Sequence, residues 1–201
     1  MSNPSNICKD QSEKTAGGID LNDYGLVCYR RFMDGDDSGL EEIVKFFSQP
    51  LMLFINGYVN NINVAEDIMS ESFLKLIIKR RRFKGNSTFK TYLFSVGRNL
   101  AVDYLRKAAS NKTVPLMTDS LSDFVELESV VIVDEQKRKI HSALWKLNDL
   151  YREVLYLSFF EDMTNEQVAL VLKKSKKQVE NLLYRAKQSL KAILEREGIT
   201  L

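Results

Sequence analysis

Apolar residues recur every three or four positions over most of the chain, which is the spacing of one face of an α-helix. The first helical stretch runs from residue 21 to about residue 82, with a turn at residues 34–37 after which Ser38 can cap the next helix. Residues 83–87 have the composition of a loop, and helical spacing resumes from Phe89 to about residue 109. Since no segment has strands alternating with turns, the pattern predicts an all-α fold.

Two residues indicate where helices begin or end in the first half of the chain. Pro50 predicts a break near Gln49, because proline has no amide hydrogen to donate inside a helix. Asn63 predicts the start of another helix, since Glu66 is placed to reach back to the backbone amide of Asn63.

The helical spacing is lost after residue 109, where Pro115, several Ser and Thr residues and a group of acids follow one another. We therefore expect two small helical domains, at residues 21–109 and 135–201, joined by a flexible acidic linker at 110–134. Residues 1–20 are polar and predict a disordered arm.

Composition excludes several classes of protein. None of the 201 residues lies in an apolar run long enough to cross a membrane, and the first residues lack a hydrophobic signal core, so we expect a cytoplasmic protein. Cys8 and Cys28 are too few for a disulfide framework, and inert thiols are favoured over the alternative of redox-active ones. His141 is the single histidine. We expect no metal site, no cofactor and no catalytic residue, and therefore no enzyme.

The net charge is only +2, but the charges are unevenly distributed. Residues 79–107 and 173–191 are strongly basic, with Asp103 and Glu180 as their only acids, and residues 111–136 between them are acidic. Two basic blocks favour a polyanionic partner, because clustered cations gain affinity by releasing condensed counterions. The alternative is two solvated helix faces.

The second basic block contains two helix starts in quick succession. Thr164 with Gln167, and Ser175 with Gln178, each have the spacing of a capping box. The helix between them is only about two turns long, so the segment has the layout of a helix-turn-helix, whose second helix enters the major groove of DNA. A helical hairpin with a charged surface is the alternative.

The second of these helices can be divided into two faces. Its apolar stripe is Val179, Leu183, Ala186, Leu190 and Ile193. The opposite face carries side chains that can pair with base edges or phosphates, and Lys176 and Lys177 at the helix N-terminus are placed for phosphate. The residues of this outer face are Lys177, Glu180, Asn181, Tyr184, Arg185, Lys187, Gln188 and Lys191.

The first half has two candidate surfaces. Asp67, Glu71 and Lys75 stack at helical spacing beside Glu66 and Ser70, which indicates either an acidic docking stripe for a basic protein or a solvated helix face. Residues 81–98 mix cations with aromatic rings, as surfaces that bind single-stranded nucleic acid do. Some of these rings are equally compatible with core positions.

The two motifs, in this order and at this separation, resemble the extracytoplasmic-function sigma factors of bacterial RNA polymerase. AEDIMSESFLKLI and RFKGNSTFKTYLFSVGRNLAVDYLRK resemble sigma region 2, and ALWKLNDLYREVLYLSFFEDMTNEQVALVLKKSKKQVENLLYRAKQSL resembles sigma region 4. The resemblance covers about residues 24–108 and 135–195, with no domain between them.

The resemblance implies a transcription initiation factor that binds core RNA polymerase and promoter DNA, both duplex and melted, with no small-molecule substrate. The implied polymerase-binding residues are Glu66, Asp67, Ser70, Glu71 and Phe73. The implied minus-10 residues are Lys84, Asn86, Ser87, Thr88, Lys90, Arg98, Asn99 and Arg106. The implied minus-35 residues are Lys176, Lys177, Glu180, Asn181, Tyr184, Arg185, Lys187 and Gln188. An anti-sigma factor is a further implied partner.

Three positions depart from the family pattern: Ser70 stands where Gln is frequent, residues 172–175 lack the usual turn glycine, and Glu180 replaces a frequently basic residue. An alternative is a stand-alone helix-turn-helix regulator whose first half senses a ligand or dimerises. The basic aromatic block in the first half argues against this regulator. A nuclease is a third alternative, and it would need a cluster of carboxylates or histidines.

Overall fold

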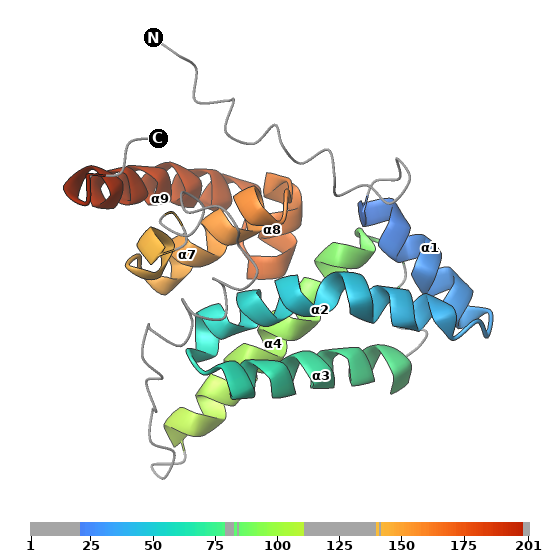
Figure 1. The fold of residues 1–201 in the computed structure, drawn as a ribbon. Coiled ribbons are helices and arrows are strands. Elements are labelled where there is room, and N and C mark those ends of the chain that lie inside the picture. Colours follow the sequence, from blue (N-terminus) through green and yellow to red (C-terminus); the bar gives the residue numbers. More distant parts are fainter. Residues whose placement is uncertain (1–20, 79–82, 84, 111–139, 141, 199–201) are drawn as a thin grey trace.

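The computed structural model describes residues 21–78, 83, 85–110, 140 and 142–198 (Figure 1). Every regular element in these residues is helical, which confirms the all-α prediction. The expected arm at 1–20 and linker residues 111–134 lie outside the described residues, as do Cys8, Lys84 and His141.

The N-terminal half consists of α1 (Leu21–Met33), α2 (Ser38–Val59), α3 (Ile62–Ile78) and α4 (Phe89–Ser110). Helix α2 lies in the middle of this half and packs against the other three. Its buried stripe includes Ile43, Phe47, Leu51 and Phe54, which follow one another at helical spacing. The α1–α2 crossing is close, because a Cβ atom at Gly39 would lie 2.3 Å from the backbone oxygen of Cys28.

Three local predictions for this half are wrong. Helix α2 continues through Pro50 without a break near Gln49, and the apolar side chains packed on either side of the proline account for this continuity. Ser38 does not cap α2; its amide instead donates to Oδ1 of Asp36 at 3.1 Å. Helix α3 starts before Asn63, and Asn61 caps it by accepting the amide of Val64 at 3.0 Å.

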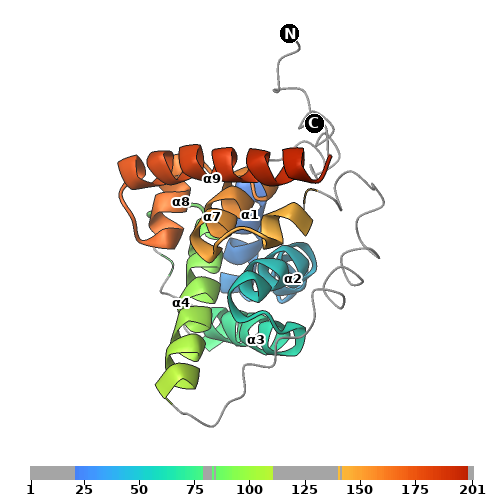
Figure 2. The same ribbon diagram turned by 90° about the vertical axis from the view of Figure 1, so that its left-hand side faces the viewer.

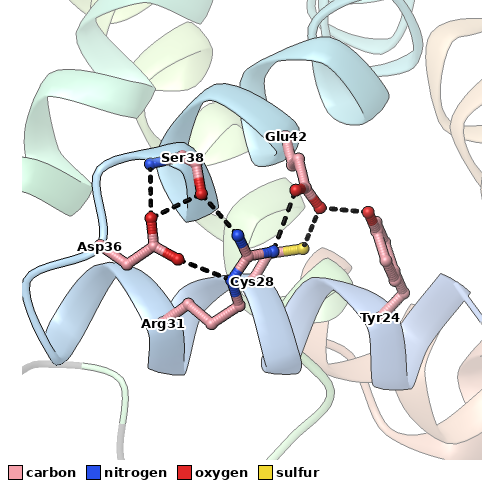
Figure 3. Close-up of polar contacts among 6 residues, drawn as sticks. All are labelled: Tyr24, Cys28, Arg31, Asp36, Ser38 and Glu42. Atoms are coloured by element: carbon pink, nitrogen blue, oxygen red, sulfur yellow. Dashed lines mark hydrogen bonds and ion pairs between the residues drawn. The ribbon is translucent and has the colours of Figure 1, made fainter.

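A polar cluster that the sequence did not reveal fastens α1 to the start of α2 (Figure 3). The Glu42 carboxylate accepts hydrogen bonds from the Tyr24 hydroxyl, from the Cys28 thiol at 3.3 Å and from Arg31 at 2.9 Å. Arg31 also donates to Asp36 at 2.9 Å. These donors lower the pKa of Glu42, with the Tyr24 hydrogen bond as the largest cause. Cys28 is fully buried, and burial raises the pKa of its thiol, which agrees with the expectation of an inert cysteine.

Replacing Glu42 by glutamine is expected to destabilise the protein at neutral pH. A carboxyl group whose folded pKa is depressed stabilises the fold above its unfolded pKa, and that stabilisation is lost as the pH falls through the folded pKa. The difference in unfolding free energy between the wild type and Glu42→Gln should therefore be present at pH 7 and shrink steadily below pH ~4. Urea unfolding at a series of pH values measures it, and a pH-independent difference would contradict this role for Glu42.

The C-terminal half includes α7 (Asp149–Leu155), the π-helix η2 (Tyr156–Phe160), α8 (Asn165–Leu172) and α9 (Lys176–Arg196), and residues 142–145 before α7 are helical as well. Helix α9 packs against both α7 and α8. Buried Val154, Leu157, Val168, Val171 and Val179 form the centre of this half. The apolar face predicted for the last helix is therefore the face that α9 turns inward.

The two halves pack directly on each other, α4 against α8 and α2 against α7. The hydrophobic core is continuous across this contact: Phe54 of α2 stacks on Tyr156 of η2 at 6.0 Å between ring centroids. Helix α9 and helix α3 lie at opposite ends of the described structure in both Figure 1 and Figure 2. The two candidate binding helices are therefore well separated from each other.

Candidate functional sites

The helix-turn-helix of the C-terminal half is built as the sequence predicts. Thr164 accepts the amide of Gln167, whose side chain accepts the amide of Thr164 in return at 2.7 Å. Ser175 and Gln178 form the same reciprocal pair at the start of α9, with the returning bond at 2.8 Å. Both capping boxes are confirmed, and they fix where the two helices begin.

The turn between these helices places Lys173 in the left-handed region, at φ 54° and ψ 47°. The amide of Lys173 donates to the backbone oxygen of Ala169, and so does the amide of Lys174 at 3.0 Å. Glycine is the usual residue at such a helix end, because a Cβ atom is strained there. Without a glycine, the turn therefore contains a strained residue, Lys173, but the helix-turn-helix still forms.

Replacing Lys173 by glycine is expected to raise the free energy of unfolding by about 1 kcal/mol, since the left-handed strain of an L-residue disappears. Lys174→Gly is the matched control, because Lys174 has no positive φ. At that position glycine should lower stability slightly through greater backbone entropy of the unfolded chain. Urea denaturation of both variants measures the difference, and equal effects of the two substitutions would contradict the assignment of strain to Lys173.

The outward face of α9 is exposed over its whole expected length. Tyr184 at its centre is 68% exposed, although it is a large ring. The remaining exposed residues of this face are Lys177, Glu180, Asn181, Arg185, Lys187, Gln188 and Lys191. Lys176 is exposed too, but its ammonium group pairs with Glu166 of α8 at 2.5 Å, which ties together the N-termini of the two helices. The ammonium group of Lys187 lies 5.0 Å from the ring centroid of Phe159.

The acidic stripe of the N-terminal half lies on the outer surface of α3. Glu66, Asp67, Ser70 and Glu71 are all exposed, and Glu71 pairs with Lys75 at 3.2 Å. Leu74, 53% exposed, continues the same surface toward the end of the helix. Phe73 is instead buried in the core, so it supports α3 from within and is absent from the exposed face.

The expected minus-10 residues do not share one exposed surface. Asn86 and Arg106 are exposed, whereas Ser87, Thr88 and Asn99 are half-buried. The side chains of Lys90 and Arg98 are only 11% and 17% exposed, because the C-terminal half covers them. Of the aromatic rings in this segment, Phe89 and Phe94 are buried, while Tyr92 and Phe83 are partly buried and pack on each other at 5.1 Å.

Two acids of the C-terminal half, which the sequence did not single out, oppose these cations. The Lys90 ammonium lies 2.6 Å from the Glu161 carboxylate and donates to the Glu161 backbone oxygen at 2.7 Å. Arg98 pairs with Glu153 at 3.9 Å, and burial raises the pKa of the Glu153 carboxyl group. The partners in these two ion pairs lie far apart along the chain, so the sequence gives little indication that they meet. The one signal is that an acid, Glu161, follows the aromatic segment 156–160.

The described residues contain no group of three or more His, Cys, Asp or Glu side chains arranged to hold a metal ion. Among the helices of the described part of the chain, none is both long enough and apolar enough to cross a membrane.

Comparison with known proteins supplies the context for these surfaces. The Sigma-70 region 2 family matches residues 47–111, and the Sigma-70 region 4 family matches residues 137–190. The chain is 26% identical to "ECF RNA polymerase sigma factor SigM" of Bacillus subtilis over 159 residues, covering 78% of this chain and 96% of the relative. It is 23% identical to "ECF RNA polymerase sigma factor SigW" of the same organism, covering 78% and 89%.

Solved structures show the same fold. CnrH in complex with the cytosolic domain of CnrY matches with a TM-score of 0.60 and 21% identity, covering 87% of this chain and 97% of the other. The sigma factor RpoE in complex with the anti-sigma factor NepR from Bartonella quintana matches with a TM-score of 0.57 and 18% identity, covering 77% and 96%.

The two region matches occur in the order expected for sigma factors, and together they span both packed halves of the fold. The likeness to the two relatives, each over 78% of this chain, agrees with them. This chain belongs to the sigma-70 family, in its extracytoplasmic-function class of RNA polymerase sigma factors.

Proposed function

We propose that this chain directs bacterial core RNA polymerase to promoters by docking through the acidic face of α3 and reading the minus-35 element with α9. The observation that carries the proposal is that α3 and α9, which lie at opposite ends of the described structure, each have an exposed polar row, acidic on α3 and mainly basic on α9. A factor that bridges a protein and DNA needs two such faces that do not compete for space.

The docking half of the proposal rests on charge and exposure. Glu66, Asp67 and Glu71 lie on one helix face, and all three are exposed in the described part of the chain. A row of carboxylates favours a basic partner surface, since complementary potentials steer association and set the register. Leu74 adds an apolar contact at the end of the row, where burial on docking would contribute further affinity.

The reading half rests on the chemistry of the exposed side chains of α9. Asn181 and Gln188 can pair with adenine edges, Arg185 with guanine, and the ring of Tyr184 can contact a thymine methyl group. Glu180 can accept a hydrogen bond from cytosine, which is how its departure from the family pattern would change the preferred sequence. Lys177 and Lys187 are placed for phosphate contacts, which position the helix and carry no sequence information.

The minus-10 element is proposed to be read as a melted strand by the 85–90 segment together with Arg98, Asn99 and Arg106 of α4. Extruding a base costs a few kcal/mol, which binding in a pocket must offset. The linker between the domains lets two weak DNA contacts act together, because tethering raises the effective concentration of the second domain.

The remaining partners follow from the family. Both similar solved structures are complexes: CnrH with the cytosolic domain of CnrY, and the sigma factor RpoE with the anti-sigma factor NepR. We infer that an anti-sigma factor also binds this chain, and that the chain acts in the cytoplasm, where the polymerase is. A sigma factor catalyses no bond chemistry, so no cofactor or catalytic residue is assigned.

Arg185→Ala tests the assignment of the reading helix. Loss of one bidentate base contact costs about 1–3 kcal/mol, so the affinity of the holoenzyme for its preferred duplexes should fall by about tenfold to a hundredfold. The duplexes are first enriched from a random pool by the wild-type holoenzyme. Lys45→Ala, which removes one exposed cation from α2, is the control and should change neither affinity nor sequence preference. Unchanged preference in Arg185→Ala would rule out α9 as the reader.

A further inference from the structure

Helix α1 precedes the segment that matches the region 2 family, which begins at residue 47, yet α1 packs against α4 beside residues 85–88, the loop of the proposed minus-10 segment. We propose that Tyr29 of α1 is a positioning residue for binding of the melted minus-10 strand, because its ring holds both ends of this loop. The inference rests on the proposed function, since it takes the loop to contact the strand.

The two ends of the loop meet in one cluster of aromatic rings. Phe83 precedes the loop, Phe89 follows it as the first residue of α4, and their ring centroids lie 5.9 Å apart, edge to face. Tyr29 contacts both rings, with centroid distances of 5.6 Å to Phe83 and 5.2 Å to Phe89. These distances lie in the range of about 4.5–7 Å at which aromatic pairs attract each other. Since Tyr29 is only 4% exposed, its ring is a buried support for both ends of the loop.

The two ends are held by different contacts. At the C-terminal end, the Thr88 hydroxyl accepts a backbone amide of α4 at 3.2 Å, which fixes this end to the start of the helix. At the N-terminal end, Phe83 contacts three rings, those of Tyr29, Phe89 and Tyr92. Phe89 and Tyr92 belong to α4, so Tyr29 is the ring that links the start of the loop to another helix.

The position of α1 is itself closely defined. Gly25 lies one turn before Tyr29, and a Cβ atom there would lie 2.8 Å from the Phe89 ring, so this close approach requires glycine. The adjacent face of α1 is fastened to the Glu42 carboxylate of α2 by the polar cluster of Figure 3. Helix α1 therefore presents Tyr29 to the loop from a fixed position.

A loop that is held in place favours binding of a melted strand. Gly85 and Asn86 are exposed, and Gly85 has a φ of 76°, a backbone conformation that glycine adopts without strain. A loop that samples many conformations must be ordered when it binds, and this entropy cost weakens affinity. Anchoring both ends removes part of that cost before the strand arrives. Loss of the Tyr29 ring should therefore weaken strand binding, although the groups that touch the strand are unchanged.

Two substitutions disturb this support from different sides. Tyr29→Leu removes the ring from both ends of the loop, and Gly25→Ala displaces the Phe89 ring. Tyr29→Phe keeps the ring and is the rescue variant. Ile43→Ala is the control for lost core volume, since Ile43 is 1% exposed in α2 and belongs to none of these ring pairs. All variants are compared at a temperature at which circular dichroism shows them to be folded.

Each full-length variant is measured in two ways. Hydrogen exchange of the free chain reports on the amides of Thr91 and Tyr92, which donate to Thr88 at the end of the loop. Fluorescence anisotropy of the holoenzyme reports on binding of a single-stranded DNA and of a duplex. Both DNAs are first enriched from random pools by the wild-type holoenzyme.

Tyr29→Leu and Gly25→Ala should exchange these amides severalfold faster and bind the single strand about tenfold more weakly, with duplex binding within about twofold of the wild type. Tyr29→Phe and Ile43→Ala should match the wild type in all three measurements. Unchanged exchange in Tyr29→Leu and Gly25→Ala would overturn the proposal, as would faster exchange with unchanged strand binding. An equal loss of strand binding in Ile43→Ala would overturn it too. If the wild-type holoenzyme enriches no sequence, the proposed function fails and the role of Tyr29 in strand binding fails with it, while the exchange data still decide whether Tyr29 holds the loop.

Discussion

Replacing Asp67 by lysine is expected to weaken association with bacterial core RNA polymerase by about a hundredfold. Asp67 is exposed at the centre of the acidic face of α3. It makes no ion pair with another described residue, whereas Glu71 forms an ion pair with Lys75. A reversed charge places lysine against a basic partner surface, and such like-charge contacts cost several kcal/mol, with each 1.4 kcal/mol worth a factor of about ten. Fluorescence anisotropy of the labelled chain at moderate salt measures the affinity.

Glu41→Lys is the control for this experiment, because it makes the same charge change at an exposed position of α2, away from the acidic stripe. It should retain polymerase binding within a few-fold. If Asp67→Lys and Glu41→Lys weaken binding equally, the effect comes from net charge, and the docking assignment of α3 is wrong.

Replacing Phe94 by alanine is expected to lower the free energy of unfolding by about 3–5 kcal/mol, the usual cost of removing a buried aromatic ring. Phe94 is fully buried in α4 and packs on Phe54 at 5.2 Å, at the point where the core passes from one half of the molecule to the other. Since domains of this size are stable by only about 5–15 kcal/mol, a large part of the stability should be lost. Urea denaturation followed by circular dichroism measures the change.

Tyr184→Ala is the matched control, because it truncates an aromatic side chain that is 68% exposed. Its unfolding free energy should stay within about 0.5 kcal/mol of the wild type, while binding of the minus-35 duplex is lost. A small effect of Phe94→Ala on stability would contradict the continuous core, and a large effect of Tyr184→Ala would show that the outward face of α9 is part of the fold.

The features that could be predicted from the sequence are those set by local spacing. A capping box needs residues only three positions apart, so Thr164 with Gln167 and Ser175 with Gln178 were both identifiable. The two faces of α9 follow from one helical period, and the inward and outward residues separate as expected. The acidic face of α3 was identifiable for the same reason, apart from Phe73, which belongs to the core.

The features that could not be predicted depend on contacts between distant segments. Pro50 was expected to break its helix, but the packing of α2 against α1, α3, α4 and α7 outweighs the missing hydrogen bond. Phe94 was compatible with either core or surface until α2 was placed against α4. Lys90 and Glu161 lie 71 positions apart, and no sequence spacing indicates that they meet.

The central claim, that this chain selects promoters for core RNA polymerase, is tested most directly by run-off transcription on genomic fragments of the source organism. Core polymerase with this chain should give discrete transcripts that are absent with core polymerase alone and strongly reduced with Asp67→Lys. Their start sites should share two upstream sequence elements, and Arg185→Ala should impair use of the one further from the start. A chain that binds DNA but yields no new transcript with active core polymerase would contradict the account.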